Sequence, residues 1–243
     1  MINKDEIIIS EQQLFDYMKC PALYYYKYIK KFKVPEKVTT HSLLTKVMKY
    51  FLIQIQNGQI PSLKEIQRRW DLAYAHHKDI IKEEKIVSGW QKLIKFVEWF
   101  SSEKILVADV NTPYSIDVQN VTIKGNIEQI ITNGNRDKIE LFYANFSDKD
   151  NDAVYKENNL KFTIDSYAFK TLFQDRESGI LVFDTKKDQI YKTYRTEGDF
   201  AKLRADIWSI GNSIKNGYYY TRESFMCENC ICNQYCKFFN IGI

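Results

Sequence analysis

The spacing of five cysteines constrains this 243-residue chain more than any other feature. Cys227, Cys230 and Cys236 follow a C-x2-C-x5-C pattern, which places three thiolates around one metal centre and leaves a fourth position to be filled. Cys20 is the only cysteine outside this C-terminal segment. We therefore expect Cys20 to supply the fourth ligand of an iron-sulfur cluster or of a zinc ion, which would join the two ends of the sequence.

Two other arrangements of the cysteines are open. A self-contained zinc knuckle would use Cys227, Cys230, Cys232 and Cys236, and it needs no distant partner. In the arrangement with Cys20, Cys232 is instead the spare cysteine. Disulfides would require an oxidising compartment, but MINKDEIIIS lacks the basic segment and apolar run of a signal peptide, so we expect a cytoplasmic protein.

The composition favours a compact soluble protein. With 44% hydrophobic residues the chain can bury one sizeable core. No apolar run approaches the roughly 20 residues of a membrane span, so no membrane association is expected. Only 9 Gly and 4 Pro argue against long linkers. The formal net charge of +4 permits nucleic-acid binding without requiring it.

The segment from Ser10 to Tyr28 carries the second informative pattern. Ser10 is a candidate N-cap, apolar residues follow at helical spacing, and Pro21 marks a break or a new first turn. The run reads S-x2-Q-L-x2-Y-x2-C-P-x2-Y-x3-Y. With the C-terminal cysteines it resembles the iron-sulfur branch of the RecB-type nucleases, in the PD-(D/E)XK superfamily. That branch includes the AddB subunit of helicase-nuclease complexes and the CRISPR-associated RecB-like exonucleases.

This resemblance implies a cofactor and an architecture. A 4Fe-4S cluster would be held by Cys20, Cys227, Cys230 and Cys236, with Zn2+ as the alternative. The fold class would be α+β with an α/β nuclease core, in which helices flank a central mixed sheet. One domain over 1–243 would comprise a helical insertion at about 41–103, a sheet core at about 104–195, and a C-terminal helix and cluster-binding segment at about 197–243.

The periodicity of the chain agrees with this architecture. Helical spacing predicts helices at 40–56, 61–77, 79–101 and 200–216. Short Val-, Ile- and Thr-rich runs predict strands at 105–118, 121–132, 138–146, 179–183 and 189–194. Asn133-Gly134-Asn135 is a hairpin signal, and a turn is expected at Lys186-Lys187.

The resemblance also implies where a nuclease site would lie. Two carboxylates on neighbouring strands would hold Mg2+ or Mn2+, and a lysine two residues after the second would help to position the attacking water. His41 stands where the family often has a metal-binding histidine. Gly125-Asn-Ile-Glu128 matches the motif of the first carboxylate, with glutamate in place of aspartate.

The remaining site motifs are altered. Phe142 and Ala144 stand where the family has its second carboxylate and its lysine, and neither can bind a metal or donate a hydrogen bond. The family's Gln-x-x-x-Tyr falls on Thr163 to Tyr167, so the tyrosine is kept and the glutamine is lost. Glu140, Asp148, Lys149 and Lys124 are nearby candidates to replace the lost groups.

Interleaved aromatic and basic residues indicate a surface for a nucleic-acid strand, because rings stack on bases and ammonium groups contact phosphates. The alternative is that the tyrosines pack the helix against the metal centre while the lysines are solvated. The candidate nucleic-acid-binding residues are Tyr24, Lys27, Lys30, Lys31, Lys33, Lys186 and Lys187.

Three functions remain open from the sequence. The first is a catalytically degenerate nuclease-fold protein that binds DNA and a helicase, nuclease or other processing or defence protein. The second is an active Mg2+- or Mn2+-dependent DNA exonuclease with a rearranged site around His41, Glu128 and Tyr167. The third is a structural docking module that binds no nucleic acid.

Overall fold

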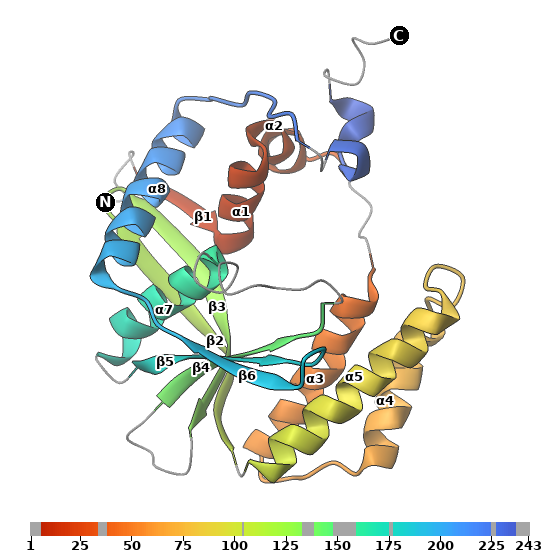
Figure 1. Ribbon diagram of the computed structural model, residues 1–243. Coiled ribbons are helices and arrows are strands. Elements are labelled where there is room, and N and C mark those ends of the chain that lie inside the picture. The colour runs from red at the N-terminus through yellow and green to blue at the C-terminus, as the bar shows by residue number, and fades with distance from the viewer. Residues whose placement is uncertain are drawn as a thin grey trace. The chain divides into compact units, whose positions relative to one another are not determined.

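The computed structural model describes residues 6–33, 38–103, 105–132, 139–147, 159–174, 177–224 and 227–236 (Figure 1). Its contacts divide the chain into two compact units. A terminal unit comprises residues 1–37, 113–125 and 197–243, and a central unit comprises residues 38–112 and 126–196. The boundaries between the units fall within strand β2 (Leu106–Val118) and at Gly125 in strand β3 (Val121–Thr132).

The described strands form a six-stranded mixed sheet, which confirms the expected fold class. Strand β1 (Ile7–Ser10) pairs in parallel with β3, and β2 also pairs with β3. Strand β4 (Ile139–Asn145) is antiparallel to β3 and parallel to β5 (Glu177–Asp184), which pairs with the antiparallel β6 (Gln189–Thr193). Helix α7 (Leu160–Phe173) lies in the connection from β4 to β5, because parallel neighbours need a crossover.

The terminal unit begins with a broken helix. Helix α1 (Glu11–Lys19) is capped by Ser10, whose hydroxyl accepts from the backbone of Gln13 while the Gln13 side chain accepts from the Ser10 backbone. Pro21 occupies the first position of α2 (Pro21–Tyr24), and a π-helical turn, η1 (Tyr25–Ile29), follows. The sequence therefore predicted both the cap and the restart at Pro21 correctly.

Two glycines permit close packing in the terminal unit. A Cβ on Gly211, in α8 (Glu197–Lys215), would lie 2.3 Å from a methyl group of Val121, so only glycine lets this helix approach β3. A Cβ on Gly125 would lie 2.4 Å from the Tyr114 hydroxyl. The glycine of the Gly125-x-x-Glu128 motif therefore makes room for a tyrosine of the neighbouring strand.

The cysteine-rich segment is short and irregular. It contains two single-turn 3-10 helices, η2 (Cys227–Asn229) and η3 (Asn233–Tyr235). Gly217 ends the preceding helix α8 with a positive φ of 71°, as the sequence predicted for a glycine at this position.

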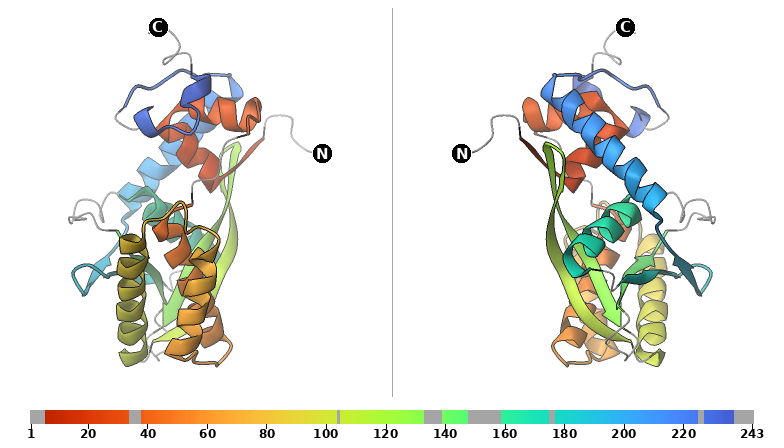
Figure 2. Two further views of the ribbon diagram at one scale, coloured as in Figure 1. Left: turned by 90° about the vertical axis from the view of Figure 1, so that its right-hand side faces the viewer. Right: turned by 90° about the vertical axis from the view of Figure 1, so that its left-hand side faces the viewer.

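In the central unit, helices cover both faces of the strands (Figure 2). Helices α3 (Thr40–Gln56), α4 (Leu63–Ala75) and α5 (Glu83–Ser102) pack against one face through a core that includes Phe96, Phe142 and Phe183. Helix α7 covers the opposite face, where Phe162 contacts Tyr143. On β4, Phe142 therefore faces α5, and Tyr143 faces α7.

No helix in the described ranges is long and apolar enough to cross a membrane. Most predicted elements are present with shifted ends, while the hairpin signal at 133–135 and the candidates Asp148 and Lys149 lie outside the described residues. Strand β1 was not predicted, and α5 starts at Glu83 rather than at Asp79.

Candidate functional site

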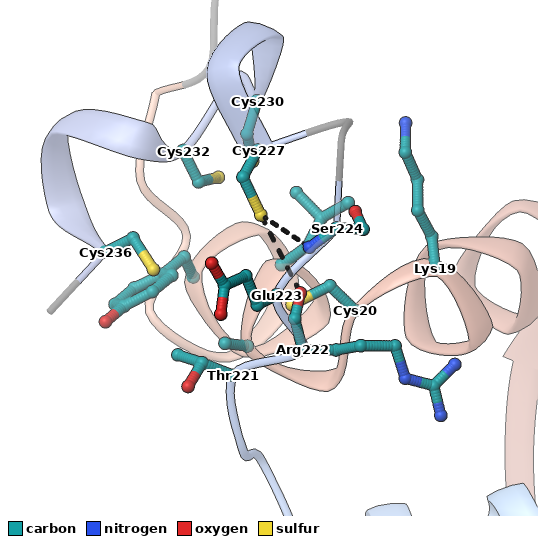
Figure 3. A pocket seen from close by; sticks show the side chains of 13 residues that line it. Lys19, Cys20, Thr221, Arg222, Glu223, Ser224, Cys227, Cys230, Cys232 and Cys236 are labelled. Carbon is teal, nitrogen blue, oxygen red and sulfur yellow. Dashed lines mark hydrogen bonds between the residues drawn. The ribbon is translucent and has the colours of Figure 1, made fainter. Parts of the chain in front are cut away.

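All five cysteines line one cavity of about 40 Å³ in the terminal unit (Figure 3). None of them forms a disulfide. Cys20 lies between α1 and α2, and the other four come from the segment around η2 and η3. The structure thus brings together the two cysteine-bearing segments, which are about two hundred residues apart in sequence.

Backbone contacts hold these two segments side by side without using the cysteines. The Tyr17 hydroxyl donates to the Tyr218 carbonyl at 2.5 Å, and the Ala22 amide donates to the Tyr220 carbonyl at 3.1 Å. Arg222 Nη1 donates to the Met18 carbonyl at 2.9 Å. The residues leading to the cysteines are therefore attached to α1 and α2 through Tyr17, Met18 and Ala22.

Stacked tyrosines strengthen the same attachment. The Tyr219 ring stacks on Tyr24, with centroids 6.0 Å apart, and on Tyr25, with centroids 5.2 Å apart. Tyr24 is only 4% exposed, so its ring is not available to a nucleic-acid base. The prediction that Tyr24 binds nucleic acid was wrong, because burial of its ring against Tyr17, Tyr28 and Tyr219 stabilises the fold.

Ionisation of several thiols in this cavity is unfavourable in the absence of a bound cation. Burial raises the pKa of Cys230, and the nearby Cys20, Cys227 and Cys236 raise it further through like charge, although a hydrogen bond to the Cys232 backbone opposes them. Cys227 Sγ accepts the Ser224 amide at 3.4 Å (Figure 3). Amide donors of this kind tune the sulfur ligands of metal centres.

The cysteines are of the donor type that a thiolate-bound metal centre uses. Four thiols whose negative charges would repel one another require a positive partner before all can ionise, which an iron-sulfur cluster or zinc would supply. In the parts of the chain that the structure describes, no three His, Cys, Asp or Glu side chains converge closely enough to hold a single ion.

Cys232 differs from the other cysteines. It is 1% exposed, whereas the others are half-buried. Burial, with the nearby Cys230 adding like charge, raises the pKa of the Cys232 thiol to about 11. Cys232 is therefore the most buried of the five cysteines, and its role as the spare cysteine stays a prediction.

The predicted basic residues divide into two kinds. Lys27 Nζ forms an ion pair with the buried Asp16 at 2.7 Å, and Tyr28 donates to the same oxygen at 2.7 Å, so Lys27 serves the fold of the terminal unit. Its expected phosphate-binding role is therefore not supported. The exposed lysines are Lys30, Lys31 and Lys33 in the terminal unit and Lys186 and Lys187 in the central unit.

The turn that carries Lys186 and Lys187 is ordered by a carboxylate. Asp184, which is 2% exposed, accepts the backbone amides of Lys186 at 3.0 Å and of Lys187 at 3.2 Å. The predicted turn is confirmed, and both of its lysines are exposed.

In the central unit, His41 and Glu128 line one pocket of about 490 Å³. The pocket is formed by the start of α3, by β3 and β4, and by the start of α7. Its polar lining also includes Asn145, Asn159 and Lys161. The structure thus brings His41 and Glu128 to one pocket, although Tyr167 is not among the residues that line it.

The residues of β4 that border this pocket differ from those expected. Phe142 is 0% exposed and points to the α5 face, where its ring stacks on Trp99 at a centroid distance of 5.6 Å. Tyr143 lies on the opposite face, toward α7, and lines the pocket. Because side chains alternate along a strand, Tyr143 and Asn145 share the face of Glu128.

This alternation shifts the residues of interest on β4 by one. Tyr143 and Asn145, rather than Phe142, share the pocket with Glu128, and Ala144 also borders it. Glu140 does not replace the lost carboxylate, because it is 4% exposed and pairs with Lys192. In either register β4 lacks an Asp-x-Lys pair.

A buried carboxylate lies behind the pocket. Asp165, on α7, is fully buried and accepts a hydrogen bond from the Tyr143 hydroxyl. Lys161 Nζ forms an ion pair with it at 2.8 Å and also donates to the Asn126 carbonyl at 3.0 Å. The sequence interpretation missed Lys161 and Asp165. Their spacing of four residues on a helix was the available signal, since such pairs face one another.

The surroundings of His41 favour a neutral imidazole. Packing around the ring lowers the pKa of His41, and the charge of Lys92 lowers it further, while the Glu128 carboxylate opposes both. A neutral imidazole presents one acceptor nitrogen and one donor. His41 can therefore accept or donate a hydrogen bond in this pocket at neutral pH.

Comparison with known proteins supports the fold. No family model and no curated protein matches the chain. The structure is similar to that of a "putative exonuclease" from Eubacterium rectale, with a TM-score of 0.57 and 10% identity, over 94% of this chain and 88% of that chain. The structure of SSO0001 is 15% identical over 93% of this chain and 92% of that chain, but its TM-score of 0.36 is too low to indicate a shared fold. The chain therefore has a fold similar to that of a protein named as an exonuclease.

Proposed function

We propose that this chain is a nuclease-fold protein that no longer cuts and that binds DNA, as single strands or ends, within a nucleic-acid-processing or defence complex. We infer the loss of cleavage from the residues that line the pocket of His41 and Glu128. Glu128 faces Tyr143 and Asn145, where metal-dependent hydrolysis needs a second carboxylate and a lysine. A phenol and an amide neither supply the missing charge nor assist the attacking water.

The same proposal includes a 4Fe-4S cluster held by Cys20, Cys227, Cys230 and Cys236. Its support is the shared cavity, the free thiols and the amide donor at Cys227. When bound, the cluster crosslinks two segments that are distant in sequence. In this role it stabilises the protein, and the chain's own residues perform the binding.

A second candidate function has one observation in its favour. Lys161 lines the same pocket as His41 and Glu128, so a lysine is present although it comes from α7 rather than from β4. An active metal-dependent exonuclease would use Glu128 and His41 as ligands and Lys161 near the attacking water. Against this, Lys161 is ion-paired with Asp165.

The test is cleavage and binding by anaerobically purified protein. End-labelled single-stranded and duplex DNA is incubated with Mg2+ or Mn2+ and with wild type, Glu128→Ala or Lys161→Met. We expect no cleavage by any of them, together with salt-dependent binding of DNA. Cleavage by wild type that both variants lose would establish the second candidate. Absence of both cleavage and salt-dependent DNA binding would favour a docking module without a nucleic-acid ligand.

A further inference from the structure

A second hollow of the central unit carries a concentration of positive charge that the nuclease-like pocket does not explain. It has a volume of about 600 Å³ and lies between the start of α3, the 80–92 segment and the end of β4. Among the residues that the structure describes, three lysines line it, namely Lys82, Lys85 and Lys92, together with one carboxylate, Glu84. We call this hollow the lysine groove.

The helix α5 sets the spacing of this charge. Lys85 and Lys92 are seven residues apart, so they lie on one side of the helix about 10 Å apart along its axis. Lys82 precedes the first turn and lies three residues before Lys85. The three lysine side chains therefore start from positions spread along the helix axis instead of from a single turn.

A hydrogen bond and two hydroxyl groups also contribute to the lining of the lysine groove. Lys92 Nζ donates to the Phe146 carbonyl at 2.9 Å, which holds its charge at the junction of α5 and β4. Hydroxyl groups of Thr39 and Ser88 add hydrogen-bonding capacity. Lys82 and Lys85 are exposed and can reach a ligand from solvent.

His41 connects the lysine groove to the nuclease-like pocket, because it lines both. A ligand that runs along the row of lysines therefore reaches His41 and then Glu128. A row of cations over about 10 Å matches successive phosphates of a chain better than a single phosphate, which needs convergent donors. A hollow of this volume takes a segment the size of a small ligand, hence part of one strand.

We propose that the lysine groove binds the phosphodiester backbone of a single nucleic-acid strand and directs its end toward His41. This inference rests on the proposed function and names the surface that performs it. Lys82 and Lys85 are the contacts expected to matter most, and the strand end would lie in the pocket of Glu128 and Tyr143.

The test compares two double variants of equal charge. Lys82→Gln with Lys85→Gln alters the groove, and Lys64→Gln with Lys95→Gln removes the same charge from exposed helix positions outside it. Neutralising lysines at the start of a helix also removes an unfavourable interaction with its dipole, so the groove variant should fold. Circular dichroism checks this, and fluorescence anisotropy measures binding of an oligo(dT) of about 16 nucleotides across a salt series.

We expect the groove variant to bind roughly tenfold more weakly at low salt, with a log-log salt slope smaller by about 1.4 than that of wild type, at about 0.7 per lost phosphate contact. The control variant should stay close to wild type. Equal affinities and slopes for the two variants would overturn the groove while leaving the proposed function intact. Failure of wild type to bind would overturn both. Inhibition by millimolar inorganic phosphate at constant ionic strength would mean that the groove recognises free phosphate, which also contradicts a strand site.

Discussion

The Tyr143 hydroxyl donates a hydrogen bond to the buried carboxylate of Asp165, and the two residues join β4 to α7. In the position that faces Glu128, this tyrosine contributes to the stability of the central unit instead of binding a metal. A charged acceptor in the interior depends on its donors, because an unsatisfied carboxylate oxygen loses the solvation it would have in water.

Replacement of Tyr143 by phenylalanine should therefore destabilise the protein by about 1.5–3 kcal/mol, the usual range for a hydrogen bond to a charged group. Urea unfolding followed by circular dichroism measures the change. Tyr191→Phe is the matched control, since its hydroxyl bonds to the exposed Gln189 and its loss should cost little. Equal stability of the two variants would show that the Tyr143 hydroxyl does not support Asp165.

Phe142→Ala tests on which face the residues of β4 lie. Phe142 is fully buried among Phe96, Trp99 and Phe100, so its truncation should cost about 3–5 kcal/mol. Leu72→Ala, at a position that is 54% exposed, serves as the control and should cost under about 1 kcal/mol. A Phe142 variant as stable as wild type would place this ring outside the core and restore the register inferred from the sequence.

Two cysteine variants distinguish the ligand sets. If the proposed cluster is bound, Cys20→Ser should lose its iron and its visible absorbance, whereas Cys232→Ser should retain both, because Cys232 is buried and burial raises the pKa of its thiol to about 11. Iron content per chain and the absorbance spectrum are measured on protein purified without oxygen. The reverse result, with metal lost only in the Cys232 variant and zinc as the metal found, would establish the knuckle formed by the C-terminal cysteines alone.

The ion pair between Lys192 and Glu140 predicts a pH dependence. Partial burial lowers the pKa of Lys192, but hydrogen bonds to Glu140 and Tyr194 outweigh this effect and raise the pKa above its ordinary value of 10.5. A raised pKa in the folded state means that the stabilisation is complete below the unfolded value and is lost as pH rises through the folded value. The stability difference between wild type and Lys192→Met should therefore be constant from neutral pH to about 10 and should narrow at higher pH. Lys187→Met, at an exposed position, should show no such narrowing.

The exposed lysines after η1 provide a separate test of the terminal unit. Changing Lys30, Lys31 and Lys33 together to glutamate should lower DNA affinity and flatten its salt dependence if these residues contact phosphates. Lys46, Lys64 and Lys95 are exposed positions of the central unit and, changed together to glutamate, give the same change in net charge. If both triple variants bind DNA equally, the patch after η1 makes no specific contribution.

The sequence predicted the elements well, because hydrophobic periodicity, caps and turn residues are local signals. Ser10, Pro21 and Gly217 each mark a boundary that the structure confirms. Strand β1 was missed because it has only four residues, and its pairing with β3 depends on residues more than a hundred positions away.

The site was predicted less well, for a physical reason. A shift of one residue in a strand reverses the faces, and the letters Leu-Phe-Tyr-Ala are apolar on both sides, so they do not indicate which side is buried under α5. Tyr24 and Lys27 were misjudged because an aromatic or basic residue has the same identity whether it faces solvent or packs against Tyr219 or Asp16. Only long-range packing separates these cases.

The attachment of residues 218–222 to α1 and α2 has a consequence for the order of assembly. Because hydrogen bonds from Tyr17, Ala22 and Arg222 and the stacking of Tyr219 involve no cysteine, the two segments can meet before any metal arrives. If the chain binds the proposed cluster, folding would precede its insertion, and the cysteine cavity would be a receptor for a preassembled cluster. Metal-free chain would then be a folded intermediate in biosynthesis, competent to accept the cofactor, rather than an unfolded by-product.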